Sequence, residues 1–337
     1  MYDLKSKLRI ETSINSSGKL LAEKTIPVLK EKHYFVEDID LDGDAPKQFI
    51  RAYRYREDSG IRRTHCWTWE AFIAKTAEKW YPHESVIEYM INRIGQTIGL
   101  RMNEVELLRI NGQIRFLSKF FLRPNEVLIH GAEICGGYLN DQALAEQIAN
   151  DPKDSRELFT FEFICKAIHS IFGEHADDII SDLVALIAYD AITGNNDRHF
   201  YNWGVITTTK KSAVAPKLAP VYDSARGLLW NESDEQLVRM QQNIQHGSTK
   251  LEKYLVNAMP RISVEGDSKI NHFGLIGFLK NLNPAYRFLI EKIASRDNEQ
   301  KAIKMLNEEF FRYFYKERKE LILLILTNRF KKVREIC

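Results

Sequence analysis

Two acidic residues and an asparagine in the second half of the chain have the types and the spacing needed to transfer a phosphoryl group. Asp197 and Asn202 lie five positions apart in a polar loop, and Asp223 follows in a separate segment. Phosphoryl transfer requires a carboxylate that accepts or orients the proton of the attacking hydroxyl, and oxygen ligands that hold Mg²⁺ against the nucleotide phosphates. We therefore predict that Asp197 is catalytic and that Asn202 and Asp223 bind the metal.

The elements expected around these residues fit that chemistry. The apolar run 182–192 has the length and composition of a buried helix, and Gly194 ends it. Residues 203–206 and the threonines after them predict a short strand, and a second short segment leads to Asp223. An Asp-x-x-x-x-Asn interval alone is common by chance. Between a buried helix and a short hairpin, it is typical of the catalytic loop of protein kinases.

These motifs also carry a family resemblance. The run Ile-Thr-Gly-Asn-Asn-Asp-Arg-His at 192–199, Asn-Trp-Gly at 202–204 and Pro-Val-Tyr-Asp at 220–223 resemble the HipA-like serine/threonine kinases. This bacterial group includes the toxins of HipBA-type toxin–antitoxin systems and some stand-alone effector kinases. The resemblance covers about residues 49–335 and is strongest at 190–223. It implies the same roles for Asp197, Asn202 and Asp223.

The resemblance has consequences for ligands and partners. It implies ATP and Mg²⁺ as cofactors and transfer to Ser/Thr hydroxyls of a protein substrate. The translation machinery is one source of such a substrate in this family, and an antitoxin is the partner of its toxin members.

A lysine and a glutamate are expected to complete the nucleotide site. Residues 49–56 and 62–75 predict two strands, the second ending in Lys75. The helix expected at 83–99 places Glu88 next to its buried stripe, from which an acid can reach inward to pair with a nucleotide-site lysine. We predict a Lys75–Glu88 pair, with Glu84 as the competing acid and a pair of solvated charges as the alternative. The buried stripe comprises Ile87, Met90, Ile91, Ile94 and Ile98.

The turn that contains Ser59 and Gly60 is the first candidate for the loop that covers the nucleotide phosphates. One glycine is far from a Gly-x-Gly-x-x-Gly pattern, so a plain hairpin turn is the alternative and residues 16–19 are the fallback. In the HipA-like family a loop serine can be autophosphorylated, which ejects the loop and silences the enzyme. By that resemblance, Ser59 or Thr64 could be modified. Ser224-Ala225 follows Asp223 in place of Phe-Gly, so the usual activation-segment switch is not expected.

Three neighbours of the site each have two interpretations. His199 could orient the loop by bonding backbone carbonyls or act as a base, and the structural role is favoured because Asp197 already supplies the base. Arg198 could contact phosphate or brace the loop through an ion pair. Arg226 could steer the substrate or be a solvated arginine.

The whole pattern predicts an α+β fold, a bilobal protein-kinase-like architecture with a small mixed β-rich N-lobe and a mainly helical C-lobe. Residues 1–124 would form the nucleotide-binding N-lobe, with a small strand-and-helix subdomain in the first 45 residues. Further strands are expected at 105–108 and 114–122, followed by a hinge at 120–124 and a connection at 125–139. Residues 125–337 would form the C-lobe. Its helices are expected at 140–150, 155–172, 177–193, 235–244, 249–256, 275–281, 285–295 and, with a break, 299–337.

Composition fits an ordinary globular protein of 337 residues, 44% hydrophobic and 28% charged, with a net charge of +2. This charge predicts no direct nucleic-acid binding. Neither a signal peptide nor a membrane-spanning run is apparent, so we expect a cytoplasmic protein, or one secreted without a cleaved leader. The scattered cysteines predict free thiols. An arginine group could contact an acidic or RNA-bearing partner, although a solvated strand face is favoured; it comprises Arg51, Arg54, Arg56, Arg62 and Arg63.

Two other functions compete with an active protein kinase. A phosphoinositide kinase shares the Asp-Arg-His-x-x-Asn wording but needs a basic, membrane-facing patch after Asp223. Residues 224–250 instead carry three cations, Arg226, Arg239 and Lys250, against three acids, Glu232, Asp234 and Glu235. A catalytically dead kinase fold that acts as a binding module would lack the lysine or a metal ligand, and none is lost here.

Overall fold

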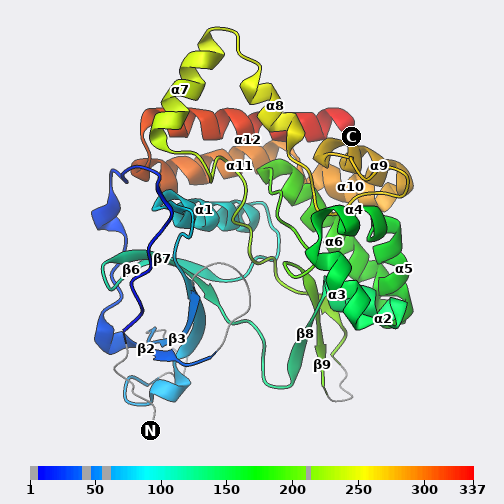
Figure 1. Ribbon diagram of the computed structural model, residues 1–337, viewed down its shortest axis with the longest axis horizontal. Coiled ribbons are helices and arrows are strands. Elements are labelled where there is room, and N and C mark those ends of the chain that lie inside the picture. The colour runs from blue at the N-terminus through cyan, green and yellow to red at the C-terminus, as the bar shows by residue number, and fades with distance from the viewer. Residues whose placement is uncertain (1–6, 40–46, 55–61, 210–213) are drawn as a thin grey trace.

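The computed structural model describes residues 7–39, 47–54, 62–209 and 214–337. The chain forms two lobes, one built on a sheet and the other mainly on helices (Figure 1). This is the α+β, two-lobed arrangement predicted from the sequence. None of the helices in the described ranges has both the length and the apolar character needed to span a bilayer.

The described part of the N-lobe contains a five-stranded antiparallel sheet in the order β2-β3-β4-β7-β6. Side chains alternate between the two faces of the sheet, and those of Phe72 and Ala74 are buried on one face, in a cluster with Leu8 and Leu29 of the N-terminal segment. The other face packs on helix α1 (His83–Thr97), whose predicted stripe is fully or almost fully buried. The strands are β2 (Tyr34–Glu37), β3 (Lys47–Ala52), β4 (Glu70–Lys75), β6 (Val105–Ile110) and β7 (Gln113–Lys119).

Two expectations for the N-lobe were wrong. The described residues 7–39 are not a separate subdomain, because β2 is the edge strand of the main sheet and β1 (Asn15–Ser16) pairs with β5 (Trp80–Tyr81). Short 3₁₀ turns at Glu23–Thr25 and Glu31–His33 lie between β1 and β2. The strand expected from residue 62 begins only at Glu70, after a 3₁₀ turn at Cys66–Thr68. Strand pairing over such sequence distances has no local signal.

The C-lobe is organised around α6 (Ala176–Thr193), which is buried along most of its length. Helices α2 to α5 lie on one side of it, and α7 to α12 form a layer across the top of both lobes in Figure 1. The helices are α2 (Gly131–Leu139), α3 (Gln142–Asn150), α4 (Pro152–Leu158), α5 (Phe161–Phe172), α7 (Asp234–Gln245), α8 (Lys250–Asn257), α9 (His272–Leu282), α10 (Pro284–Ile293), α11 (Arg296–Met305) and α12 (Lys316–Ile336). The break expected in the last region is a π-helical and 3₁₀ segment, Leu306–Phe310 and Phe311–Tyr313.

The connection expected at residues 125–139 is instead regular structure. It forms strand β8 (Glu126–His130) and then α2, and β8 pairs with β9 (Gly204–Thr208) of the site hairpin. Strand β10 (Lys217–Leu218) completes this small antiparallel sheet. The single helix expected at 155–172 is two, because Thr160 starts a new helix by accepting a hydrogen bond from the backbone N–H of Phe163.

The predicted states of the cysteines and of the arginine group can be compared with the structure. Cys66, Cys135, Cys165 and Cys337 are free thiols, as expected. Arg51 pairs with Glu37 and Arg54 with Glu106, while Arg62 and Arg63 are exposed but precede β4, so they do not lie on a strand face. Arg56 lies outside the described residues.

Helix α1, which carries Glu88, is fastened to the C-lobe at several points. The guanidinium of Arg93 donates to both carboxylate oxygens of Glu309, at 3.0 and 2.8 Å. Tyr89 packs against Phe310 with ring centroids 5.4 Å apart. From α6, the buried hydroxyl of Tyr189 donates to the carbonyl of Ile91 at 2.6 Å. The position of Glu88 therefore depends on residues more than a hundred positions away in sequence.

A buried polar cluster joins the N-terminus of α1 to α7 and α12. The hydroxyl of Ser17 bonds the backbone N–H and Nδ1 of His83, at 3.0 and 2.9 Å. Arg318, fully buried, donates to Asp234 at 2.9 Å and to the carbonyls of Leu229 and Glu232. Its charge is therefore matched by one carboxylate and two carbonyls in the interior.

We expect Arg318→Met to lower the free energy of unfolding by about 3–5 kcal/mol, because it leaves the Asp234 carboxylate and two carbonyls without their donor. Urea denaturation followed by circular dichroism measures this. The matched control is Lys331→Met on the same helix, in an exposed pair with Glu335, which should change stability by less than about 0.5 kcal/mol. Equal unfolding midpoints for the two variants would contradict the role given to the cluster.

Candidate active site

The loop that carries Asp197 begins at the C-terminal end of α6, which is bonded by a side chain from another helix. Gly194 ends α6 in the left-handed region, with φ of 69°, and its N–H bonds the carbonyl of Asp190. Arg329 of α12 donates to the carbonyl of Ala191 at 2.7 Å, at the end of the helix where a cation is favourable. Burial lowers the pKa of Arg329 to about 10, which leaves it charged at neutral pH.

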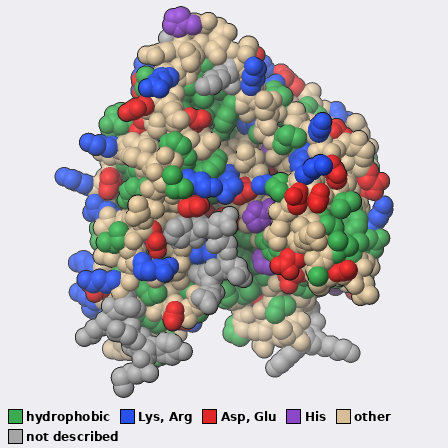
Figure 2. Space-filling model, viewed as in Figure 1, with side chains coloured by type: hydrophobic (Ala, Val, Ile, Leu, Met, Phe, Trp, Pro, Cys, Tyr) green, Lys and Arg blue, Asp and Glu red, His purple; other side chains and the backbone are tan. Residues whose placement is uncertain are grey.

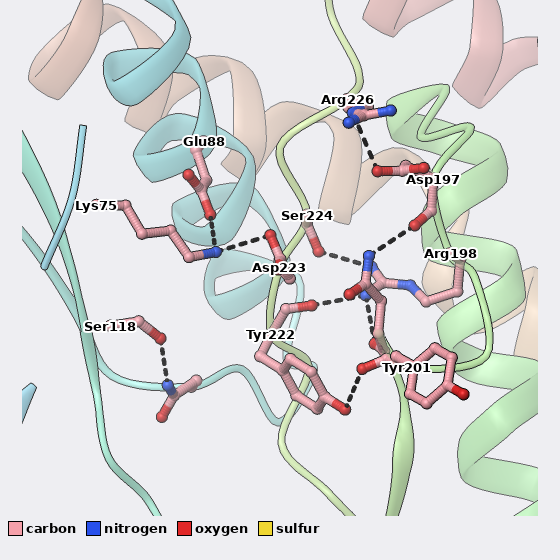
Figure 3. Close-up of polar contacts among 12 residues, drawn as sticks. Lys75, Glu88, Ser118, Asp197, Arg198, Tyr201, Tyr222, Asp223, Ser224 and Arg226 are labelled. Carbon is pink, nitrogen blue, oxygen red and sulfur yellow. Dashed lines mark hydrogen bonds and ion pairs between the residues drawn. The ribbon is translucent and has the colours of Figure 1, made fainter. Parts of the chain in front are cut away.

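Arg198 braces the loop from within, which was one of its two predicted roles. It is buried and donates twice to Asp190, at 2.9 and 3.0 Å. Its other bonds go to the carbonyls of Asn202 and Tyr222 and to the hydroxyl of Ser224, at 2.9, 2.6 and 2.6 Å (Figure 3). One guanidinium therefore ties α6, the loop of Asp197 and the segment of Asp223 together.

Asp197 and Asn202 are brought together as the spacing predicted. The side-chain amide of Asn202 donates to the carbonyl of Asp197 at 2.8 Å, which orients its amide oxygen. The two carboxylate oxygens of Asp197 face arginines, Oδ2 at 3.0 Å from Nε of Arg226 and Oδ1 at 3.3 Å from Arg261. Arg226 is thus an ion-pair partner of the predicted catalytic residue instead of a solvated side chain.

Lys75 lies between two carboxylates. Its Nζ is 2.8 Å from Oδ1 of Asp223 and 3.3 Å from Oε1 of Glu88 (Figure 3). The predicted Lys75–Glu88 pair is therefore present in the structure. Glu84, the competing acid, instead accepts from the backbone N–H groups of Lys79 and Trp80, at 2.9 and 2.8 Å. Asp223 has a positive φ of 52°, a conformation that is uncommon for a residue with a side chain and clusters at functional sites.

The electrostatics of these three groups follow from burial and from their mutual contacts. Burial raises the pKa of Glu88 to about 7, although the neighbouring Lys75 opposes the shift. Burial also raises the pKa of Asp223, but Lys75, with smaller contributions from Arg198 and Lys47, outweighs it and holds that pKa below its usual value. Burial lowers the pKa of Lys75, and the two carboxylates more than compensate, so the lysine stays protonated. Asp223 is therefore the carboxylate that stays ionised most readily.

His199 bonds the loop backbone, as the structural interpretation of this residue requires, but through a different backbone group. Its Nδ1 accepts from the backbone N–H of Tyr201 at 3.2 Å, where a bond to a carbonyl was expected. Burial lowers the pKa of His199, so the ring is neutral at neutral pH and can accept this bond. The ring therefore helps to shape the loop beside Asp197.

The predicted phosphate-loop residues Ser59 and Gly60 lie outside the described residues. The fallback at residues 16–19 has a structural role, since Ser17 is buried and bonds His83.

Three residues near the site were missed by sequence reasoning. Lys47 pairs in register with Lys75 across β3 and β4, and its charge contributes to the lowered pKa of Asp223. Asp190 holds Arg198, and Arg261 reaches Asp197 from the segment between α8 and α9. The last turn of a buried helix is a signal that could have singled out Asp190. No local pattern marks Lys47 or Arg261.

The donor set fits a magnesium–nucleotide complex. Asn202 offers an amide oxygen and Asp223 a carboxylate, and both are the hard oxygen ligands that Mg²⁺ prefers. Over the described part of the chain, no group of three or more His, Cys, Asp or Glu could hold a metal by itself. Two protein ligands are typical of Mg²⁺ sites in which phosphates and water complete the shell. Basic, acidic and histidine side chains gather in the middle of the face shown in Figure 2, between the lobes.

Fold and site together define a bilobal kinase-like protein, and comparisons with known proteins agree. The model for the HipA-like C-terminal domain matches residues 39–273. This is well over half of the chain, so the protein belongs to the HipA-like family of kinases. A search of curated proteins gives no match.

Solved structures are also similar to the chain, among them the following two. The first is the proinflammatory kinase CtkA of Helicobacter pylori, with a TM-score of 0.64 and 18% identity over 79% of this chain and 89% of that chain. The second is a chain of the HipA, HipB and operator DNA complex of a Shewanella oneidensis toxin–antitoxin system. Here the TM-score is 0.50 and the identity 14%, over 78% of this chain and 58% of that chain. At these identities the similarity shows the fold alone.

We expect the stability of Glu88→Gln, relative to the wild type, to rise as the pH increases. The pKa of Glu88 is 4.5 when unperturbed and about 7 in the fold, so the folded state binds the proton more tightly than the unfolded state. The wild type therefore loses stability as the pH rises from 4.5 to 7, and the glutamine variant, which does not titrate, keeps its stability. Melting temperatures of both proteins from pH 5 to 8 measure the difference. Glu308→Gln, at an exposed position, is the control. A difference for Glu88→Gln that stays flat, or shrinks as the pH rises, would contradict this picture.

Proposed function

We propose that the chain is an active, ATP-dependent protein kinase that transfers the γ-phosphoryl group to a serine or threonine hydroxyl of a protein. The observation that carries this proposal is the convergence, from both lobes, of Lys75 with Glu88, of Asp223, and of the Asp197–Asn202 loop. The lysine, its glutamate, the loop acid and the two oxygen ligands that phosphoryl transfer requires support this proposal, and Arg198 bonds both the loop of Asn202 and the segment of Asp223.

In this mechanism the oxygen of the substrate hydroxyl forms a bond to the γ-phosphorus, and Asp197 accepts the hydroxyl proton. The bond between the γ-phosphorus and the β–γ bridging oxygen breaks, and ADP leaves. Lys75 supplies a fixed positive charge to the phosphates while Glu88 holds it in place. Asn202 and Asp223 would hold Mg²⁺, which when bound neutralises the phosphate charge. Neutral His199 and buried Arg198 maintain the loop geometry.

The alternatives are less well supported. A dead binding module would not need a buried lysine between two carboxylates, because such a group is costly to bury. A phosphoinositide kinase would need a membrane-facing cationic surface after Asp223. In the segment after Asp223, the cation Arg226 pairs with Asp197 at the centre of the site, so it is not part of a membrane-facing surface. The substrate protein and an antitoxin partner follow from family resemblance, and we propose them only as classes.

The test is ³²P transfer from Mg-ATP to the purified chain and to proteins of a cell lysate. We expect Asp197→Ala to lower transfer by about 10²–10⁴-fold while leaving Mg-ATP binding measurable by calorimetry. Lys75→Met and Asp223→Ala should weaken both transfer and Mg-ATP binding. Asp178→Ala, an exposed acid at the start of α6, is the control and should behave as the wild type.

Absence of transfer by the wild type, together with absence of Mg-ATP binding, would overturn the kinase proposal and leave the binding module. Transfer that persists in Asp197→Ala would move the catalytic role to another residue.

A further inference from the structure

Asp197 is held by two arginines from different parts of the C-lobe. Arg226 follows Asp223 by three positions, and Arg261 comes from the segment between α8 and α9. They contact opposite carboxylate oxygens, at 3.0 and 3.3 Å. Their side chains are 30% and 24% exposed, whereas that of the bracing Arg198 is 3% exposed. Both arginines can therefore meet a molecule that arrives from solvent.

The charges around Asp197 do not balance. The two guanidinium groups carry two positive charges and Asp197 one negative charge. The other acids of the site have their own partners, Asp190 on Arg198, and Asp223 and Glu88 on Lys75. Among the described residues neither Arg226 nor Arg261 pairs with a second carboxylate. One positive charge is therefore in surplus locally, beside the residue that would receive the acceptor hydroxyl, while the opposite surplus lies at Lys75, which serves two carboxylates.

The surplus lies on the acceptor side of the site. In Figure 3 the segment of Asp223 lies between the Lys75–Glu88 pair and the Asp197–Arg226 pair. Arg226 also lies over the ring of Trp230 at 5.5 Å, which supports its planar face and leaves its edge nitrogens for hydrogen bonds. A guanidinium held in this way suits the two-pronged binding of a carboxylate or phosphate.

We propose that Arg226 and Arg261 form a specificity site for an anionic group beside the acceptor serine or threonine. The inference rests on the proposed kinase function and deepens it. When the acceptor hydroxyl bonds one oxygen of Asp197, the arginine on that oxygen is released to an incoming anion. The anion is the carboxylate of an acidic residue or the phosphate of an already phosphorylated one. Both present the same chemistry to a guanidinium.

The experiment maps the sites phosphorylated in a cell lysate by mass spectrometry, with Asp197→Ala as the blank. One lysate is dephosphorylated beforehand and another is left untreated. The wild type should select sites with acidic or phosphorylated neighbours by about tenfold to a hundredfold over neutral ones, as expected for a hydrogen bond to a charged group. Selection that survives dephosphorylation identifies carboxylates, and selection lost with it identifies phosphate.

Arg226→Gln and Arg261→Gln should move the ratio of acidic to neutral sites toward one, whatever happens to the total rate. Arg226→Lys, which keeps the charge but not the planar fork, should retain part of the selection. Arg287→Gln, in an exposed pair on α10, is the control and should keep all of it. Melting temperatures of each variant identify a loss of folding.

Wild-type sites with no anionic bias, or a bias unchanged in both glutamine variants, overturn this inference while the kinase stands. No site above the Asp197→Ala blank overturns the proposed function itself, and with it the inference.

Discussion

The buried ion pair between Arg198 and Asp190 is the interaction on which the site depends. Both side chains are almost completely removed from solvent, so the pair is costly to desolvate and is weak evidence for net stability. Its contribution is geometric. Because the same guanidinium also bonds Asn202, Tyr222 and Ser224, the loop of Asp197 and the segment of Asp223 share one anchor. Loss of either charge would leave the other buried and unpaired, so removal of one partner would be strongly destabilising.

The last helix of the chain supports both halves of this arrangement. From α12, Arg329 holds the end of α6, where the catalytic loop starts. From the same helix, Arg318 joins the polar cluster at the start of α1, which carries Glu88. Lys75, Glu88 and Asp197 come from separate elements, so their mutual distances depend on this C-terminal layer. Regions without catalytic residues thereby determine the geometry of the site.

Sequence reasoning found the parts of the site that are local and missed those set by long-range packing. Asp197, Asn202 and Asp223 lie within one helix–loop–hairpin unit, and the Lys75–Glu88 pair follows from a strand end and a helical stripe. Strand β8 was missed because its partner β9 is about eighty residues further along the chain. Lys47 and Arg261 were missed for the same reason, since strand register and loop packing place them. Helix periodicity is local, which is why most helices were predicted and most errors concern strands.

Two carboxylates serve one lysine, and the difference between them is informative. The closer Asp223 has its pKa held low, while burial raises that of Glu88 to about 7. Asp223 is also the predicted metal ligand, so one of its oxygens must be available for that role. Glu88 belongs to a helix fastened to the C-lobe and stays beside Lys75 in either case. If Asp223 holds Mg²⁺ as proposed, the second acid would keep Lys75 from becoming a buried, unpaired charge, which would explain why a group as costly to bury as Glu88 lies there.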